Sequence, residues 1–350
     1  MEPSIPLSAR RLNGRQQSFL DAFRMCAALC VLVCHACVFS GIPHGIDGQI
    51  FFVIGDLGVV MFFLLSGFLS AYTLESKDVD RNYSFSSFVR HKLKRILWEY
   101  VPALLFVAAL DAISIRLNGA NYRYYDDFNL KTFFGNLLFL QWTLPNRLPG
   151  VSILAFGSAK PLWTLSLEWY FYLIHGLLFL TIRNRSELRL RECAVLGYAL
   201  LLPIEYLIGG RGGGLGFLFA LGALGYYAFD RISNRTAMLL LPLGIVLALC
   251  YCALKMNAYS IYVFLFLWLV LCAGLRLLSG PTQKKRGRIA AWLSGSTFML
   301  YMLHYSILDF VFCSDFLPSN EGKLAVGVLL SLLISGGMYE LFGRRLARRF

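Results

Sequence analysis

Charged side chains are scarce in this chain. Only 15% of its 350 residues are Asp, Glu, Lys or Arg, whereas 57% are hydrophobic and the mean hydropathy is +0.61. Ordinary soluble domains carry about 25% charged residues. No segment poor in apolar residues is long enough for a separate soluble domain. The composition excludes a soluble globule and predicts an all-α polytopic membrane protein.

The chain also lacks the residue spacing of a metal site or a disulfide framework. Its nine cysteines lie mostly within apolar segments. Cys34 and Cys37 form a C-x-x-C pair, and Cys250 and Cys252 lie close together, but neither pair has a second pair at zinc-ligand spacing. We interpret the cysteines as small hydrophobic residues and predict no metal.

Apolar runs of membrane-spanning length recur along the whole chain. They cover residues 18–41, 50–74, 95–115, 161–182, 193–209, 213–229, 237–254, 258–278, 290–312 and 323–343. A shorter run at 132–144 is predicted to be interfacial or re-entrant, because a span there would force the basic segment 183–191 to the outer side. We predict about ten transmembrane helices, with a cytoplasmic segment at 1–17, a transmembrane domain at 18–343 and a cytoplasmic basic tail at 344–350.

The small set of charged residues is unevenly divided between the two signs. The chain has 33 Lys and Arg against 20 Asp and Glu, a net charge of +13. On the predicted topology, most of the basic residues fall in inner segments and both chain termini lie inside. The basic balance is therefore explained by the lipid bilayer and needs no nucleic-acid partner.

The first apolar run carries an arginine and a histidine. Arg24 and His35 are eleven residues apart, which places them on one helix face about 16 Å from each other. Charged residues inside a span are costly and usually functional. Alternatively, Arg24 extends to the membrane interface and His35 is a hydrogen-bonded core residue. Their shared face favours function.

A second group of polar residues lies in the run that begins at Pro161. Glu168, Tyr172 and His175 follow one another at i, i+4 and i+7, so they share a helix face. A glutamate inside the membrane can accept a proton or pair with a buried cation. The sequence leaves both roles open.

Depth along the helices groups these residues into two tiers. Counting from the helix ends places His35, Glu168 and His304 about 10–12 Å below the outer surface. Arg24 comes out about 9 Å from the inner surface, near the basic run 90–95. We expect an outer tier suited to proton transfer and an inner cationic tier suited to an anionic ligand. The run 90–95 alone is also what the positive-inside rule produces.

Several motifs occur together in one order along nearly the whole chain. They are Leu20-Asp-x-x-Arg24-x10-His35, Gly55-x-x-Gly58-Val-x-x-Phe62-Phe63-x-x-Ser66-Gly67-Phe68, the basic run 90–95, Trp163-x-x-Ser166-x-Glu168 with Phe171-Tyr172, and Ser296-x4-Tyr301-x-x-His304. Each motif is weak alone. Jointly they resemble acyltransferase family 3, bacterial inner-membrane enzymes that O-acylate carbohydrates.

This resemblance implies roles for specific residues. His35 would be the catalytic histidine and Arg24 its motif partner. Lys92 and Arg95 would take the places of the family's paired arginines near the acyl-CoA. The first of these is lysine here, and the usual proline soon after is displaced to Pro102. The family often carries a further SGNH-type domain, and we expect the membrane domain only.

The implied reaction moves an acyl group, acetyl by family default, from cytoplasmic acyl-CoA to a carbohydrate hydroxyl. The acceptor would be a cell-surface glycan such as an exopolysaccharide or lipopolysaccharide precursor, free or lipid-linked, and no cofactor would be tightly bound. His35, polarised by Glu168, would either remove the hydroxyl proton or accept the acyl group itself. Further candidates for substrate contacts are Trp163, Ser166, Tyr301 and His304.

Two other classes fit the same residues. In a proton-coupled transporter or flippase of a sugar or lipid-linked glycan, Arg24, His35 and Glu168 would form a relay. In a non-catalytic membrane scaffold they would only pack. CoA binding separates the enzyme from the transporter, and a His35→Ala variant with intact function would indicate the scaffold.

Overall fold

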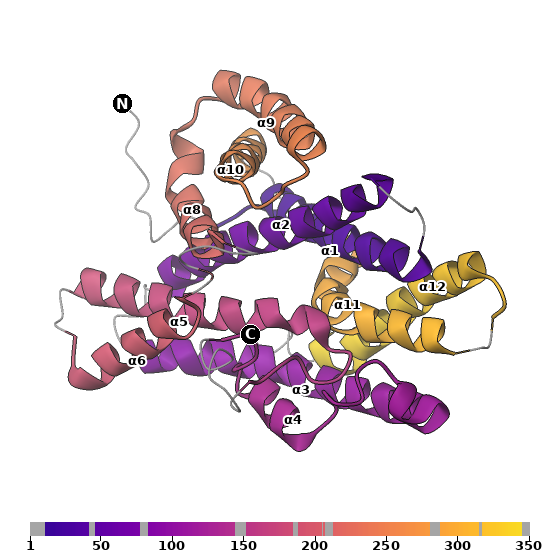
Figure 1. Cartoon of the computed structure of the whole chain (residues 1–350). Coiled ribbons are helices and arrows are strands. Elements are labelled where there is room, and N and C mark those ends of the chain that lie inside the picture. Colours follow the sequence, from indigo (N-terminus) through magenta and orange to yellow (C-terminus); the bar gives the residue numbers. More distant parts are fainter. Residues whose placement is uncertain are drawn as a thin grey trace.

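The computed structural model describes the chain in several stretches. These are residues 11–41, 46–77, 83–143, 152–184, 188–204, 206, 213–280, 288–314 and 317–344. They form α1 (Gly14–Ser40), α2 (Ile46–Lys77), α3 (Phe85–Asn118), α4 (Leu130–Leu137), α5 (Trp163–Asn184), α6 (Leu190–Leu201), α8 (Leu215–Ala228), α9 (Asn234–Lys255), α10 (Ile261–Leu277), α11 (Arg288–Cys313) and α12 (Asn320–Met338) (Figure 1). Short 3₁₀ turns lie at Gly119–Asn121, Lys160–Leu162 and Phe229–Arg231, and a π turn at Tyr339–Gly343 follows α12. Within these stretches there is no strand, which confirms the all-α prediction.

The helices are those of a multi-pass membrane protein. In the described part, seven are long and apolar enough to cross a membrane: α1, α2, α3, α5, α9, α11 and α12. The α10 helix is apolar but has 17 residues, and α6 and α8 are shorter still. The eight-residue α4 is about 12 Å long and cannot cross, as predicted for the run 132–144. The total of ten spans and the side of each terminus stay predictions.

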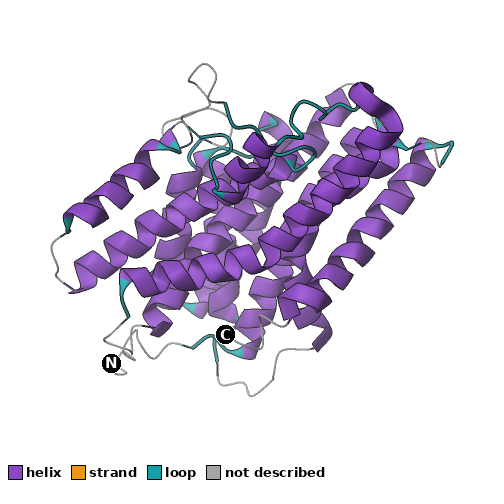
Figure 2. Cartoon of the chain, turned by 90° about the horizontal axis from the view of Figure 1, so that it is seen from below, coloured by secondary structure: helices purple, strands orange, loops and turns teal. Residues whose placement is uncertain are grey.

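Figure 2 shows the helices packed side by side in one bundle, and the contacts at its two ends join helix termini that are distant in sequence. At one end of the bundle, Arg183 of α5 and Tyr227 of α8 contact Glu75 of α2 at 3.1 and 2.8 Å. Trp98 of α3 donates to the Phe342 carbonyl after α12 at 2.8 Å. We call this the basic end, because it carries Arg90, Lys92, Lys94, Arg95 and Arg183.

The opposite end joins the other helix termini. Asn320 at the start of α12 donates to the Ser40 carbonyl at the end of α1, at 3.2 Å. The Tyr122 hydroxyl, just after α3, lies 2.8 Å from Asp309 near the end of α11. Residues 119–143 and 152–162 connect α3 to α5 here, and we call this the loop end.

The α1 helix has a defined start and stop. The Asn13 side chain accepts from the Gln16 amide at 2.9 Å, and the Gln16 side chain accepts from the Asn13 amide at 3.1 Å. The helix stops at Gly41, whose φ of 68° is left-handed. Arg24 and His35 therefore lie on one continuous helix, as predicted.

Glycines of α2 hold α1 against it. A Cβ atom at Gly58 would lie 2.5 Å from the Ala27 carbonyl oxygen, and one at Gly55 would lie 2.6 Å from Cys34 Sγ. Any larger residue would push the two helices apart. The glycines of the 55–68 motif thus permit close helix packing and set the position of the face that carries Arg24 and His35.

Candidate active site

A cavity of about 490 Å³ lies within the basic end. Its walls come from α1, α2, α3, α5, α11 and the π turn after α12. Four basic side chains line it: Arg24, His91, Lys92 and Arg95. The structure thus brings together the inner cationic tier that the sequence predicted. A space lined by several cations is suited to an anionic ligand.

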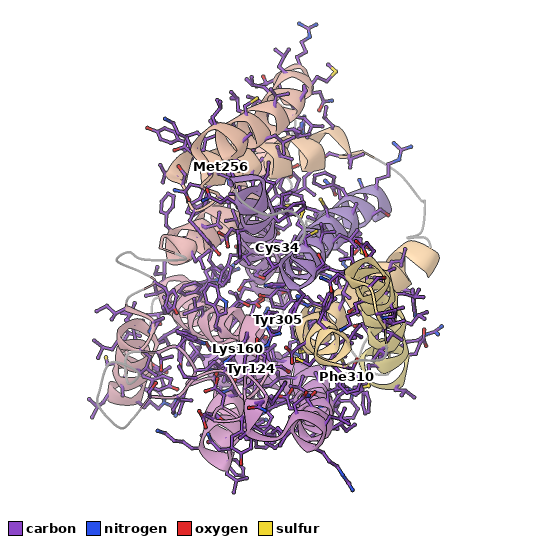
Figure 3. All side chains as sticks on the ribbon, turned by 45° about the vertical axis from the view of Figure 1, so that its right-hand side comes forward. Cys34, Tyr124, Lys160, Met256, Tyr305 and Phe310 are labelled. Atoms are coloured by element: carbon purple, nitrogen blue, oxygen red, sulfur yellow. The ribbon has the colours of Figure 1, made fainter. Side chains whose placement is uncertain are left out.

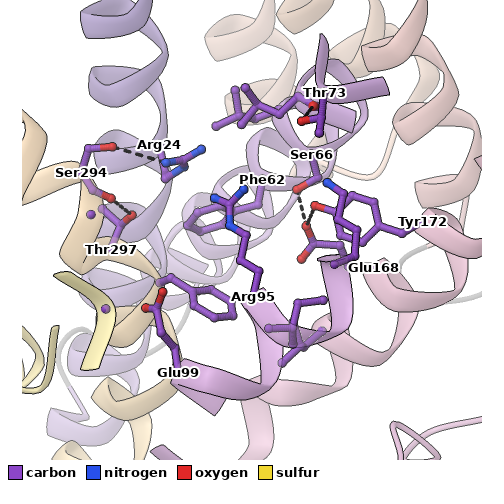
Figure 4. A pocket seen from close by; sticks show the side chains of 18 of the residues that line it. Arg24, Phe62, Ser66, Thr73, Arg95, Glu99, Glu168, Tyr172, Ser294 and Thr297 are labelled. Atoms are coloured by element: carbon purple, nitrogen blue, oxygen red, sulfur yellow. Dashed lines mark hydrogen bonds between the residues drawn. The ribbon is translucent and has the colours of Figure 1, made fainter. Parts of the chain in front are cut away.

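The Arg24 side chain is held by a polar contact to α11. Arg24 Nη1 donates to Ser294 Oγ at 3.5 Å, and that hydroxyl donates to Asp21 Oδ1 at 2.7 Å. Figure 4 shows Arg24 and Arg95 directed into the cavity from opposite walls. Asp21 is buried. Asp21 therefore orients the Ser294 hydroxyl that accepts from Arg24. The guanidinium groups of Arg24 and Arg95 face the same cavity.

Lys92 is buried among aromatic rings. Its side chain is only 5% exposed, and Nζ lies 4.1 Å from the centre of the Tyr172 ring and 5.7 Å from that of Phe88. Both distances are in the cation–π range. The resemblance to the family leads us to expect a planar arginine guanidinium at this position. In this chain the compact ammonium of Lys92 takes its place at the cavity wall, between the rings of Tyr172 and Phe88.

Glu168 lies between the two tiers and not beside His35. Its Oε1 accepts hydrogen bonds from Ser66 Oγ and Tyr172 OH, each at 2.5 Å (Figure 4). Glu168 and Tyr172 share one face of α5, as their i, i+4 spacing predicted, and the structure adds the hydrogen bond between them. Glu168 does not contact His35, although the similar depth of the two residues led us to expect it. Depth gives the level of a residue along the bundle but does not determine which neighbouring helix its side chain faces. Here Glu168 faces α2 and lines the cationic cavity.

Glu99 is a site residue that the sequence reasoning missed. It lines the cavity and is buried, and its Oε2 makes no hydrogen bond with the described residues. A buried carboxylate oxygen without a donor is costly unless a ligand or water supplies one. The only sequence indication is its position one helical turn after Arg95, on the same face.

A smaller apolar pocket of about 40 Å³ adjoins the cavity and extends from Glu168 toward Tyr301. Phe62, Ser66, Leu165, Glu168 and Phe298 line both spaces. The Tyr301 hydroxyl lies 2.6 Å from Thr164 Oγ1 and donates to the Pro161 carbonyl at 3.1 Å. This hydroxyl holds the start of α5, while the Tyr301 ring closes the pocket.

His35 and His304 form a contact beyond that ring. His35 Nδ1 lies 2.8 Å from His304 Nε2, and the two rings stack with centroids 5.1 Å apart. His304 is 1% exposed, and its Nδ1 lies 2.9 Å from the Leu300 carbonyl. Tyr305 packs edge-on against His35 at 5.0 Å. The sequence predicted only that His35 and His304 lie at similar depth, and the structure places their rings in direct contact.

The connection between α3 and α5 covers this histidine pair. The Tyr124 hydroxyl lies 2.7 Å from that of Tyr305, and Lys160 Nζ lies 4.7 Å from the Tyr124 ring centre and is paired with Asp127 at 2.5 Å. Figure 3 shows Tyr124, Lys160 and Tyr305 gathered in the middle of the molecule. Burial raises the pKa of Tyr124, so its hydroxyl stays protonated.

A buried acidic pair fixes the same connection. The Tyr122 hydroxyl lies 2.7 Å from Asp111 and 2.8 Å from Asp309, and Ser158 donates to Asp111 through its amide and hydroxyl at 2.8 and 2.6 Å. Arg123 Nε lies 3.3 Å from Asp309. Burial, with the two carboxylates, raises the pKa of Tyr122. No group of three or more His, Cys, Asp or Glu residues in the described ranges could hold a metal ion.

Two candidate substrate contacts lie apart from both cavities. The Trp163 ring stacks on Tyr206 with centroids 5.5 Å apart. The Ser166 hydroxyl donates to the Trp163 carbonyl at 2.8 Å and to the Gln141 carbonyl at 3.2 Å. Neither side chain lines the cationic cavity or the apolar pocket. Their contacts join the start of α5 to Tyr206 and to the backbone at Gln141.

The fold and these two polar sites are those of a multi-pass membrane enzyme. The sequence matches the Acyltransferase domain family over residues 17–340, so the chain belongs to acyltransferase family 3, as its motifs predicted. An O-acetyl transferase of Shigella phage Sf6 is similar to it, with 28% identity over 168 residues. That alignment covers 47% of this chain and 46% of the phage protein, so less than half of either length is compared. No solved structure matches the chain.

Proposed function

We propose that this protein transfers an acetyl group from cytoplasmic acetyl-CoA to a hydroxyl of a carbohydrate acceptor. The observation that carries the proposal is the cationic cavity at the basic end, which Arg24 lines from the same helix that carries His35. Membership of the acyltransferase family supports the reaction class, and the similar phage O-acetyl transferase supports oxygen as the acceptor atom and acetyl as the group.

The donor would bind with its phosphates in the cavity. Arg24 and Arg95 point into one space and present planar donors that match phosphate oxygens. Lys92 adds a positive charge at the cavity wall. Glu99 Oε2 would accept a hydrogen bond from an N–H or O–H group of the acyl-CoA. The nucleotide end of acyl-CoA would therefore stay at the basic end.

The acyl end would extend from there toward His35. The apolar pocket between Glu168 and Tyr301 continues the cavity in the direction of the histidine pair. The rise of α1 between Arg24 and His35 is about 16 Å. An extended pantetheine arm would follow this direction between the helices. Because the Tyr301 ring closes the 40 Å³ pocket, that ring would have to turn aside for the thioester to reach His35 from the basic side.

His35 would then act as the base. Its ring nitrogen takes the proton of the acceptor hydroxyl as the oxygen attacks the thioester carbonyl, and the same proton passes to the departing CoA sulfur. In the other route, the nitrogen attacks the thioester carbonyl, the C–S bond breaks, and the CoA sulfur takes the ring's N–H proton and leaves as the thiol. The acceptor oxygen then attacks the acyl-histidine, the N–acyl bond breaks, and the hydroxyl proton returns to the ring. Both routes use the same residue and give the same products.

The distribution of basic residues orients the protein in the membrane. Because Lys and Arg gather at the basic end, that end would face the cytoplasm, where acyl-CoA is made. The loop end would face the opposite side of a bacterial inner membrane. The acceptor would be a cell-surface carbohydrate or lipid-linked glycan that reaches the histidine pair from the loop end.

The test is turnover by purified protein in detergent. Thiol release from acetyl-CoA is measured with a mixed glycan extract for wild type, His35→Ala, Arg95→Ala and Arg90→Ala, and folding is checked by thermal melting. Arg90 is the matched control, since it is exposed on the same helix and does not line the cavity. We expect a loss of about 10²–10⁴ in kcat for His35→Ala and about a tenfold rise in KM for Arg95→Ala only.

The opposite results are equally clear. Equal turnover in wild type and folded His35→Ala would remove His35 from the mechanism. No turnover, together with no stabilisation of the protein by CoA, would contradict the acyltransferase proposal and favour transport of a glycan.

A further inference from the structure

The contacts of His304 determine which nitrogen of each histidine carries a proton. A carbonyl oxygen can only accept, so His304 Nδ1, 2.9 Å from the Leu300 carbonyl, must carry the proton of that ring. In a neutral imidazole the other nitrogen is then an acceptor. His304 Nε2 therefore accepts, and the 2.8 Å contact requires that His35 Nδ1 be the donor. In neutral His35 this leaves Nε2 as the basic nitrogen.

His304 is buried and held by contacts to its own helix and to His35. The ring is 1% exposed, it stacks on His35 with an interplanar angle of 26°, and the Leu300 carbonyl belongs to the preceding turn of the same helix. Tyr305 holds the His35 ring edge-on from the next position of α11. Two adjacent residues of one helix thus fix both the proton position and the plane of His35.

No carboxylate occupies the place that His304 takes. Glu168 receives hydrogen bonds from Ser66 and Tyr172, and Asp309, further along α11, is bound by Tyr122 and Arg123. Among the residues that the structure describes, the hydrogen bond at His35 Nδ1 is made by a neutral imidazole. A base whose other nitrogen is hydrogen-bonded by an acceptor is held in one tautomer.

We propose that His304 is the positioning residue of this enzyme, and that it fixes His35 in the Nδ1–H tautomer so that Nε2 is the reactive nitrogen. This inference rests on the proposed function for its kinetic consequence, but not for its structural one. As the acceptor O–H bond breaks, the proton forms the N–H bond at His35 Nε2, and the imidazolium strengthens its donation from Nδ1 to His304. The proton then leaves from Nε2 to the CoA sulfur.

Substitutions at position 304 separate orientation from packing. His304→Phe keeps a ring but removes the acceptor, and His304→Gln keeps an acceptor oxygen near the place of Nε2. We expect His304→Phe to lower kcat about 10- to 100-fold with KM for acetyl-CoA within twofold, and His304→Gln to recover most of the loss. Ser306→Ala is the control, because Ser306 is buried on the same helix and its hydroxyl makes no hydrogen bond with the described residues.

A spectroscopic readout tests the tautomer without activity. The chain has five histidines, so ¹⁵N-histidine NMR in nanodiscs, with the His35 signals assigned by their loss in His35→Asn, reports which nitrogen is protonated. We expect the Nδ1–H form in wild type and His304→Gln, and a mixture in His304→Phe. The Nε2–H form in wild type would overturn the inference, even if the protein proves to be an acyltransferase.

The two proposals fail in different ways. Wild-type turnover with an unchanged kcat in folded His304→Phe would refute the positioning role and leave the acyltransferase intact. Absent turnover with the Nδ1–H tautomer would contradict the enzyme and retain the structural assignment. If His304→Phe does not fold, His304→Gln and the wild-type spectrum still decide.

Discussion

Replacing Gly67 by alanine tests how closely α2 and α8 approach one another. A Cβ atom at Gly67 would lie 1.9 Å from the Phe219 carbonyl oxygen, and one at Gly222 would lie 2.0 Å from the Leu64 carbonyl oxygen. Real Cβ contacts do not fall below 3.0 Å, and the opposing atoms belong to the backbone, so the helices must separate by about 1 Å. Side chains cannot relieve this clash by rotating.

The expected magnitude follows from overpacking. Inserted methyl groups in a packed core cost about 1–3 kcal/mol, while Gly→Ala in a helix otherwise gains up to about 1 kcal/mol. Gly337→Ala in α12 isolates the helical gain, since a Cβ there meets no atom within 4 Å. We expect Gly67→Ala to melt several degrees below Gly337→Ala in detergent at one scan rate.

The pair of glycines offers a further check on the same reasoning. Gly67 and Gly222 form one contact, so the double alanine variant should lose less than the sum of the single losses. If Gly67→Ala melts with or above Gly337→Ala, the close approach of α2 and α8 is wrong. The cavity wall formed by Phe62 and Ser66 would then need a different placement.

Two further substitutions test the loop end and the cavity. Gly157→Ala should destabilise the protein by at least about 1–2 kcal/mol, because φ is +49° there and the added Cβ would lie 1.9 Å from Asp111 Oδ2. The loss is measured as a lower melting temperature, and an unchanged melting temperature would contradict this reasoning. Lys92→Met keeps the apolar stem between the rings of Tyr172 and Phe88 but removes the charge, so KM for acetyl-CoA should rise several-fold while Lys92→Arg stays near wild type. Equal KM values in steady-state assays of all three proteins would show that the charge does not contact the donor.

Local periodicity was sufficient to predict the residues that share one helix. Arg24 and His35 lie on α1 as their spacing indicated, and Tyr172 bonds Glu168 one turn away. Equal depths placed His35 and His304 in one tier, but their contact depends on the packing of α1 against α11. Depth failed for Glu168, because the direction in which a residue faces is set by tertiary packing of helices that the periodicity does not specify.

The connection between α3 and α5, which covers the histidine pair, could not be predicted from helical periodicity. Tyr124 lies in an irregular connection, and its contact with Tyr305 depends on backbone turns that carry no helical period. Trp163 and Ser166 illustrate the converse, since their motif suggested substrate contacts while their side chains contact Tyr206 and backbone carbonyls instead. Motif position alone does not distinguish a residue that builds the wall from one that faces the cavity.

The separation of charge from the histidine pair has a physical reason. Arg24 and Arg95 line a cavity of about 490 Å³ at one end of the bundle, where water can solvate them. A carboxylate in the place of His304, which is only 1% exposed, would carry a desolvation cost of several kcal/mol. The neutral His304 supplies the orienting hydrogen bond without that cost, but stabilises an imidazolium less than a carboxylate does. We therefore expect His304→Phe to lower kcat only about 10- to 100-fold. The loss of the aspartate charge from a catalytic triad lowers kcat about 10⁴-fold.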